Sequence, residues 1–169
     1  TAMTLIALIG VPWISTIKDQ LYSQTDVKQL KRALYFGRNL AITHSKRITI
    51  CPSESGSCVN DWNNALAIFE DINGNGELDK SDDLISLQGG PSPHGSWEIR
   101  SNNKGIITYF PEGFAFNSAT TFLYCPLSGN NQYATQLVLN FQGRVKSRPY
   151  LNSNGSPYAN LGALTCPKR

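Results

Sequence analysis

Residues 15–45 read STIKDQLYSQTDVKQLKRALYFGRNLAITHS, and their apolar side chains recur at steps of three and four residues. The recurring positions are Ile17, Leu21, Val27, Leu30, Leu34, Gly37 and Ala41, whereas Lys18, Lys28, Lys31, Arg32 and Arg38 mark the solvent-facing side. This period predicts an amphipathic α-helix. At a rise of about 1.5 Å per residue the helix would be about 45 Å long. That is long for a chain of 169 residues.

The sequence after this helix is typical of β-structure. Short runs rich in β-branched and aromatic residues alternate with clusters of Gly, Pro and Asn. The expected strands are Arg47–Ile50, which Cys51-Pro52 would end, then Ala65–Phe69, Leu84–Leu87, Trp97–Arg100, Gly105–Tyr109, Phe114–Phe116, Thr121–Leu123 and Gln136–Phe141. One long helix followed only by strands indicates an α+β fold, in which the C-terminal half of the helix packs on an antiparallel sheet.

Composition divides the chain into four parts. Residues 1–14 are apolar, residues 15–45 form the helix, residues 46–148 form a β-rich head, and residues 149–169 form a polar, turn-rich loop and tail. The apolar run of residues 4–17 is too short to span a bilayer, which takes about 20 residues. Pro12 is expected to kink the helix or to begin a new one.

Charge is distributed unevenly along the chain. The net formal charge is +3, but eight of the twelve acidic side chains lie between residues 61 and 98, and none follows Glu112. The part after Glu112 still carries Arg144, Lys146, Arg148, Lys168 and Arg169. This asymmetry indicates an anionic partner for the C-terminal part.

The four cysteines are Cys51, Cys58, Cys125 and Cys166. An even number in a small domain rich in Gly, Pro, Ser and Asn suggests an oxidising compartment. The sequence allows three connectivities, of which we favour Cys51–Cys58, closing a short turn, and Cys125–Cys166, tying the tail to the head. Four buried thiols in a cytosolic protein are the alternative. A zinc site is disfavoured, because no CxxC spacing or nearby histidine pair is present.

Several segments of the chain, taken in order, resemble FimT/GspH-type minor pilins. The start TLIALIGVPWIS resembles the second half of a type IV pilin N-terminal segment, which ends in a proline. Residues 47–52 (RITICP) resemble the stretch after the pilin helix. Asp61-Trp62 with residues 69–76 (FEDINGNG) resembles an internal family motif, and residues 137–146 (LVLNFQGRVK) resemble the closing strand and Gly-Arg turn. Together the segments span nearly the whole chain.

The resemblance implies a type IV pilin-like fold, with a long N-terminal helix packed on an antiparallel β-sheet head. It implies a single-pass protein of the inner membrane with a periplasmic head, which assembles with other pilin subunits through its N-terminal helix into an extracellular pilus. Residues 1–14 would then be the remnant of a longer apolar membrane anchor.

The resemblance leaves two functions open. FimT-like minor pilins belong to type IV pili and can bind DNA for uptake during natural transformation, whereas GspH-like pseudopilins belong to type II secretion systems and do not touch nucleic acid. The turn favours the first function, because Gly-Arg-x-Arg is the signature of DNA-binding FimT-like proteins. Here it stands as Gly143-Arg144-Val145-Lys146, with Arg148 two residues on.

Physical spacing also allows this basic segment to hold a phosphate backbone. In an extended segment, the side chains of Arg144, Lys146 and Arg148 point the same way. They would stand roughly 6–7 Å apart, about the spacing of phosphates along an extended strand. The alternative is an edge strand that its charges protect from aggregation.

Four residues near the C-terminus could extend this basic segment. Lys168 and Arg169 would join it if Cys166 is bonded to Cys125. Tyr150 and Tyr158 could stack on bases or pack against the head.

The acidic loop after the second expected strand admits a calcium site. The candidate ligands are Asp71, Asn73, Asn75, Glu77, Asp79 and Asp82, at the spacing of positions 1, 3, 5, 7, 9 and 12 of an EF-hand loop. No helix precedes the loop, and Asp82 reaches less far than the usual glutamate. The alternative is a hairpin loop built from Asn-Gly turns.

Motifs for catalysis are missing from the sequence. His44 and His94 are isolated, and no Ser-His-Asp order, GxSxG, HExxH or phosphate-binding loop occurs. We therefore expect no enzyme and no cofactor other than calcium.

Overall fold

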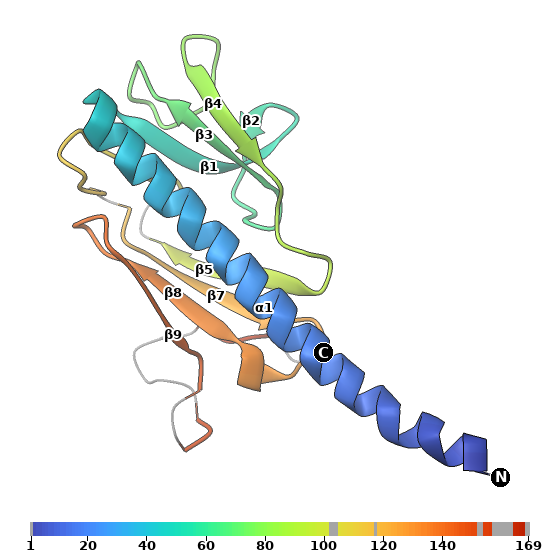
Figure 1. The fold of residues 1–169 in the computed structure, drawn as a ribbon. Helices are drawn as coiled ribbons and strands as arrows, with labels where there is room; N and C mark the ends of the chain where they lie inside the picture. The colour runs from blue at the N-terminus through green and yellow to red at the C-terminus, as the bar shows by residue number, and fades with distance from the viewer. Residues whose placement is uncertain (1, 102–104, 117, 152–153, 157–163, 168–169) are drawn as a thin grey trace.

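The structure, a computed structural model, begins with one long helix, α1 (Ala2–His44). It describes residues 2–101, 105–116, 118–151, 154–156 and 164–167, with the backbone alone for residues 2–16. Figure 1 shows the N-terminal end of α1 extending beyond the head, while its C-terminal half lies across the sheets. Within the described part of the chain, no helix is both long and apolar enough to cross a membrane.

Pro12 lies inside α1, where the sequence predicts a kink or a new helix. The residues on both sides of Pro12 belong to the same helix, so no new element begins there. A proline in a helix interior removes one N–H donor and costs about 3 kcal/mol. This cost is local, so it does not require the helix to end.

The head consists of short antiparallel strands in two sheets. The strands are β1 (Ile48–Glu54), β2 (Ser57–Cys58), β3 (Ala65–Glu70), β4 (Asp83–Gln88), β5 (Gly95–Ser101), β6 (Ile107–Tyr109), β7 (Thr120–Pro126), β8 (Thr135–Leu139) and β9 (Val145–Pro149), with the 3-10 turn η1 (Asn131–Tyr133) before β8. The first sheet has the order β2-β1-β3-β4 with β6 also on β1, and the second has the order β5-β7-β8-β9. The predicted antiparallel α+β fold is confirmed, with two sheets in place of one.

Two expectations about strands are wrong. β1 does not end at Cys51-Pro52 but continues to Glu54, because Pro52 still pairs with Leu66 and its carbonyl accepts a hydrogen bond from Val59 N (2.8 Å). Phe114–Phe116 is a loop and not a strand, because Gly113 (φ 80°) turns the chain sharply before it. Positive φ is a conformation that glycine adopts readily.

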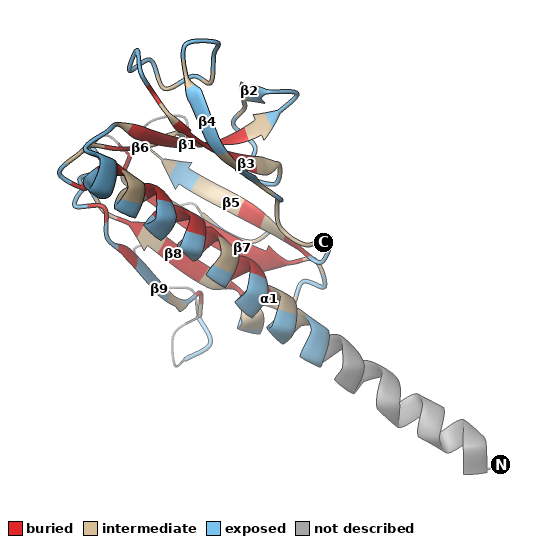
Figure 2. Ribbon diagram, turned by 45° about the horizontal axis from the view of Figure 1, so that its top comes forward, coloured by how far each residue is buried: buried red, intermediate tan, exposed pale blue. Residues whose placement is uncertain are grey.

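The main core lies between α1 and both sheets. Helix residues Val27, Leu30, Ala33, Leu34 and Ala41 pack with Ile48 and Ile50 of β1, Phe122 of β7, and Leu137 and Leu139 of β8. Figure 2 shows the buried side of α1 turned toward the sheets and its exposed side turned away. Gly37 marks the closest approach, since a Cβ there would lie 2.7 Å from Ile50 Cδ1. From Val27 to Ala41 the predicted apolar positions form the buried face of the helix, whereas Ile17 and Leu21, predicted on the same face, are 46% and 58% exposed.

Disulfides join Cys51 to Cys58 and Cys125 to Cys166, the pairing favoured from the sequence. The first closes the β1–β2 hairpin. The second ties the C-terminal segment to β7, where Leu123, Cys125, Ala134 and Tyr150 form a smaller cluster with Leu151 and Leu164. Phe122 and Tyr124 belong to the helix-side core. Alternation along a strand therefore puts this smaller cluster on the opposite face of the second sheet.

Truncation of Leu34 tests whether the helix face is the main source of stability. Leu34 is fully buried, so Leu34→Ala should lower the free energy of unfolding by about 2–5 kcal/mol. Leu21 lies on the same helix but is 58% exposed, so Leu21→Ala should cost less than about 0.5 kcal/mol. Urea titrations followed by circular dichroism measure both changes. Equal losses for the two variants would contradict this packing.

Removal of each disulfide tests how the tail is held. Cys125 and Cys166 are 41 residues apart, so replacing both by Ala should destabilise the fold by about 4 kcal/mol in the chain-entropy model. Cys51 and Cys58 are 7 residues apart, and the same replacement there should cost about 2–3 kcal/mol. Chemical denaturation of the two double variants gives the comparison. A larger loss from the shorter loop would overturn the ordering.

Candidate functional site

The turn between β8 and β9 is built by hydrogen bonds to Asn140 and by one glycine. Gly143 N donates to Asn140 O (2.9 Å), Arg144 N donates to Asn140 Oδ1 (2.9 Å), and Asn140 N donates to Arg144 O (3.1 Å). Gly143 has a φ of 75°, and a Cβ there would collide with Gly113 O and Arg38 Nε. Only glycine fits this turn without moving Gly113 or Arg38.

The pairing of β8 with β9 places the three predicted cations of this segment on one face of the second sheet. Val145 pairs with Leu139 and points into the core, and Lys146 and Arg148 pair with Val138 and Gln136. The hydrogen bond from Asn140 N extends the ladder by one pair, so the side chains of Arg144, Lys146 and Arg148 alternate with Val145 and share the opposite face. Arg144 and Lys146 are exposed, and Arg148 is partly buried. We call these three residues the basic strip.

The basic strip has no acidic neighbour to neutralise it among the described residues. The one ion pair within the ranges that the structure describes joins Lys46 Nζ to Glu70 Oε1 (2.6 Å), and it lies at the first sheet, away from the strip. The hydrogen bond to Glu70 raises the pKa of Lys46 above its ordinary value. β9 is an edge strand of the second sheet, so one side of the basic strip faces solvent. Its positive charge is therefore available to a ligand.

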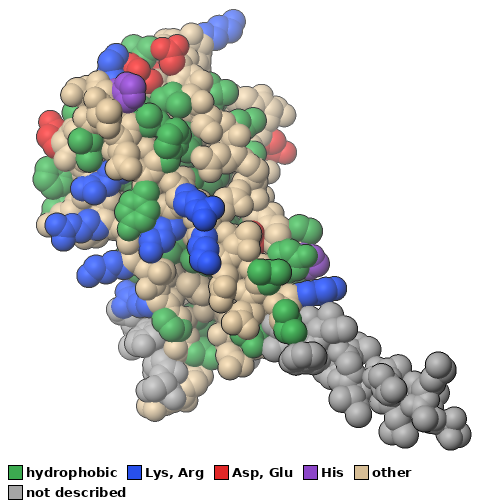
Figure 3. Space-filling model, viewed as in Figure 1, with side chains coloured by type: hydrophobic (Ala, Val, Ile, Leu, Met, Phe, Trp, Pro, Cys, Tyr) green, Lys and Arg blue, Asp and Glu red, His purple; other side chains and the backbone are tan. Residues whose placement is uncertain are grey.

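Helix α1 brings more cations close to β9. The sequence identified these residues only as the solvent-facing side of the helix. Tyr35 Oη donates to Val145 O (3.2 Å), and Lys31 Nζ lies 5.9 Å from the centre of the Tyr35 ring. Lys28 and Arg32 are exposed on the same stretch of helix. Figure 3 shows Lys and Arg side chains gathered over this side of the molecule. Their spacing was visible in the sequence, but their position beside β9 depends on tertiary packing.

Of the four C-terminal residues that the sequence added to the basic segment, the structure describes Tyr150. Lys168, Arg169 and Tyr158 lie outside the described residues. Leu123 and Arg148 both pair with Gln136, so the Cys125–Cys166 disulfide lies on the face that carries the basic strip. Tyr150 is 3% exposed and packs in the cluster around Cys125, so it offers no stacking surface.

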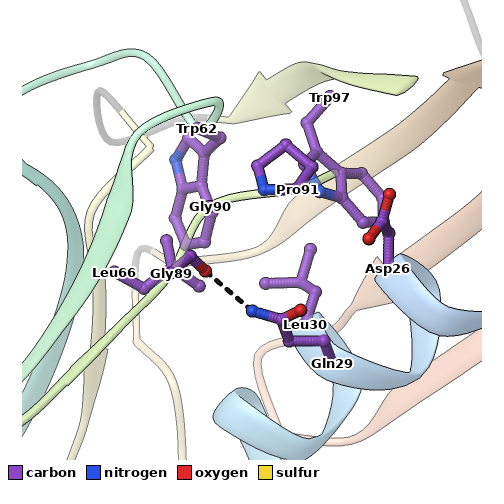
Figure 4. A pocket seen from close by; sticks show the side chains of 9 residues that line it. All are labelled: Asp26, Gln29, Leu30, Trp62, Leu66, Gly89, Gly90, Pro91 and Trp97. Carbon is purple, nitrogen blue, oxygen red and sulfur yellow. Dashed lines mark hydrogen bonds between the residues drawn. The ribbon is translucent and has the colours of Figure 1, made fainter. Parts of the chain in front are cut away.

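A small pocket between α1 and the β4–β5 linker is filled by its own side chains. Figure 4 shows Leu30, Trp62 and Trp97 converging on it, and Gln29 Nε2 donating to Gly89 O (2.7 Å). The remaining space is about 10 Å³. That is room for one water molecule at most, so the pocket is a packing joint and not a ligand site.

The acidic loop is closed by its own hydrogen bonds. Buried Asp71 accepts from Gly74 N (2.7 Å), Gly76 N (3.1 Å) and Thr49 Oγ1 (3.1 Å). Exposed Asp79 accepts from Ser81 Oγ and N, and from the side-chain amides of Asn73 and Asn75. These bonds, first those from Ser81, hold the pKa of Asp79 well below its ordinary value. Asp82 accepts from Ile72 N and Asp79 N, and Glu77 N donates to Asn75 Oδ1.

This arrangement is that of linked Asx turns, the alternative to calcium. In the described part of the chain, no group of three or more His, Cys, Asp or Glu side chains gathers in a way that could hold a metal ion. The calcium site at residues 71–82 stays a prediction of the sequence.

Calcium addition tests the loop directly. Because its carboxylates already accept hydrogen bonds from the loop itself, we expect millimolar calcium to leave the melting temperature unchanged. A rise would establish the calcium site, since a ligand bound only by the folded state stabilises it. Asp71→Asn is the check, because any calcium-dependent rise should disappear when this charge is removed.

Comparisons with known proteins agree with the fold. The family model described as "Type II transport protein GspH" matches residues 26–143. The structure is similar to that of the type IV minor pilin FimU of Pseudomonas aeruginosa, with a TM-score of 0.58 and 18% identity over 75% of this chain and 87% of that one. It is also similar to the minor pseudopilin EpsH of the type II secretion system of Vibrio cholerae, with a TM-score of 0.54 and 9% identity over 77% and 98%. No curated protein matches the chain.

The two solved structures share the type IV pilin-like fold that the sequence predicted, and at these identities they show the fold alone. Membership rests on the family model, which covers more than half of the chain, from the middle of α1 to Gly143 in the β8–β9 turn. The chain therefore belongs to the GspH family, as a minor pilin or pseudopilin subunit that assembles with other pilins.

Proposed function

We propose that this subunit is a minor pilin of a type IV pilus that binds DNA non-specifically, for uptake in natural transformation. The observation that supports the proposal is the basic strip itself. Lys146 and Arg148 share one face of the edge strand β9, Arg144 precedes them in the turn, and no acidic residue follows Glu112 in the sequence. Lys168 and Arg169 would extend the strip.

The geometry suits a phosphate backbone. Alternate side chains of a strand stand roughly 6–7 Å apart, and the phosphates of one strand of nucleic acid are separated by about the same distance. Arginine offers a planar fork of donors, whereas Lys146 supplies a point charge and holds phosphate geometry less tightly. Because phosphate contacts carry no sequence information, we expect no sequence preference.

The cations of α1 lie across the second sheet from the basic strip, because Val145 and not the strip faces the core under α1. Lys28 and Arg32 lie on the stretch of helix that Tyr35 fastens to β9. They add to the positive potential around the β8–β9 hairpin and would draw DNA toward it. In an assembled pilus a neighbouring subunit would cover part of this helix, so β9 remains the principal contact.

The setting of this function follows from the family. The N-terminal helix would anchor the subunit in the inner membrane before assembly, with the head in the periplasm, and would then pack against other pilins in an extracellular pilus. The likeness to EpsH, a pseudopilin of type II secretion, defines the alternative, in which the same fold assembles without touching nucleic acid.

Charge removal from the basic strip tests the proposal. Binding of duplex DNA should be micromolar or weaker, and log K should fall linearly with log salt concentration. The triple variant Arg144→Gln, Lys146→Gln, Arg148→Gln should weaken binding and flatten this slope by about 2.7. Fluorescence anisotropy at several salt concentrations measures both quantities.

The matched control removes three exposed charges elsewhere, by Lys18→Gln, Lys46→Gln and Lys80→Gln. It should change affinity and slope much less than the strip variant. Equal weakening by both triple variants would show that binding reflects net charge alone. Equal weakening, or no binding at all, would leave the secretion pseudopilin as the better assignment.

A further inference from the structure

Four phenylalanines gather at the end of the head that carries the β8–β9 turn. Phe110, Phe114 and Phe116 lie in the loop between β6 and β7, and Phe141 lies in the turn itself. The ring centres of Phe110 and Phe116, and those of Phe114 and Phe116, are 5.8 Å apart. We call these four residues the phenylalanine cluster.

Hydrogen bonds fasten the two segments of the cluster to each other and to α1. Ala115 N donates to Phe141 O (2.8 Å), and Arg38 Nε donates to Gly113 O (2.9 Å). Gly143 packs against the same carbonyl of Gly113. The loop that carries Phe114 and Phe116 is therefore held against the β8–β9 turn, which also carries Phe141 and Arg144, the first cation of the basic strip.

Three of these rings are open to solvent. Phe114 is 37% exposed, Phe116 is 58% exposed and Phe141 is 56% exposed. Two cations lie near the cluster, since the Arg47 guanidinium is 5.3 Å from the centre of the Phe110 ring and Arg144 follows Phe141 in the turn. Figure 3 shows hydrophobic and basic side chains side by side along the left edge of the head.

Protein sites that bind unpaired nucleobases combine exposed aromatic rings with neighbouring cations. Every base has a flat face that can stack on an aromatic side chain, while cations hold the backbone. The bases of a duplex are already stacked on one another and cannot reach such rings. A purely apolar protein partner could also cover the rings, but it would supply no counter-charge to Arg144, which is exposed in the same turn as Phe141.

We propose that the phenylalanine cluster stacks unpaired bases, so that the site takes single-stranded DNA with its phosphates on the basic strip. This inference rests on the proposed function and names its preferred substrate. Glu112 opposes it electrostatically, because it is exposed in the same loop. The unfavourable charge supplies a variant that should act in the opposite direction.

Binding of single-stranded and duplex DNA by the whole chain provides the test. Fluorescence anisotropy would use labelled oligothymidine and a duplex of equal length at one low salt concentration. Phe116→Ala with Phe141→Ala should weaken single-strand binding about tenfold or more and duplex binding less than twofold. Glu112→Gln should strengthen binding of both.

The matched control is Leu84→Ala with Leu87→Ala, two aliphatic side chains that are 53% and 62% exposed on β4, an edge of the other sheet. It should change neither affinity. Phe116→Tyr with Phe141→Tyr keeps the rings and should retain single-strand binding, which separates stacking from any loss of folding.

The outcomes distinguish this inference from the proposed function. If no DNA binds at all, the proposed function fails. If DNA binds and the alanine pair leaves single-strand affinity unchanged, or lowers both affinities equally, only the stacking role is overturned. Loss of association with other pilin subunits, with DNA binding intact, would assign the cluster to a protein interface.

Discussion

The packing of α1 against both sheets is the interaction on which the rest of the structure depends. The sheets share no described strand pairing with each other, and the core under α1 packs against both of them. The helix can approach β1 closely because small residues, Ala33, Gly37 and Ala41, lie on its buried face. From that fixed position, Tyr35 reaches β9 and Arg38 reaches the β6–β7 loop. The places of the basic strip and of the phenylalanine cluster are therefore set by the helix.

The two sheets each carry one strongly charged segment, and the two segments have opposite signs. The first sheet carries the acidic loop, in which Asp71, Asp79 and Asp82 accept hydrogen bonds from backbone, hydroxyl and amide donors. The second sheet ends in a turn that needs glycine and is followed by cations without acidic partners among the described residues. Carboxylates that already accept hydrogen bonds gain less from binding a cation. Cations without acidic partners on an edge strand favour binding of an anion. This contrast makes β9, and not the acidic loop, the functional candidate.

Much of this organisation could be predicted from the sequence, and the exceptions have physical causes. The helix was visible because its buried face repeats along the chain, and the Gly-Arg turn was visible from the resemblance of residues 137–146 to the family. Two sheets were not visible, because pairing such as β1 with β6 joins residues far apart in sequence. Phe114–Phe116 is as apolar as a strand, yet Gly113 makes it a loop. The position of Lys28 and Arg32 beside β9 depended in turn on tertiary packing, which no local pattern encodes.

The central claim is that DNA contacts the β8–β9 hairpin. The most direct measurement is a titration of the isotope-labelled protein with DNA, followed by the backbone amide signals in NMR spectra. The account predicts that the largest shifts fall on residues 140–148 and on the β6–β7 loop beside them, with smaller shifts on residues 28–35 of α1. Shifts confined to β4 and the acidic loop, or spread evenly over the surface, would contradict it.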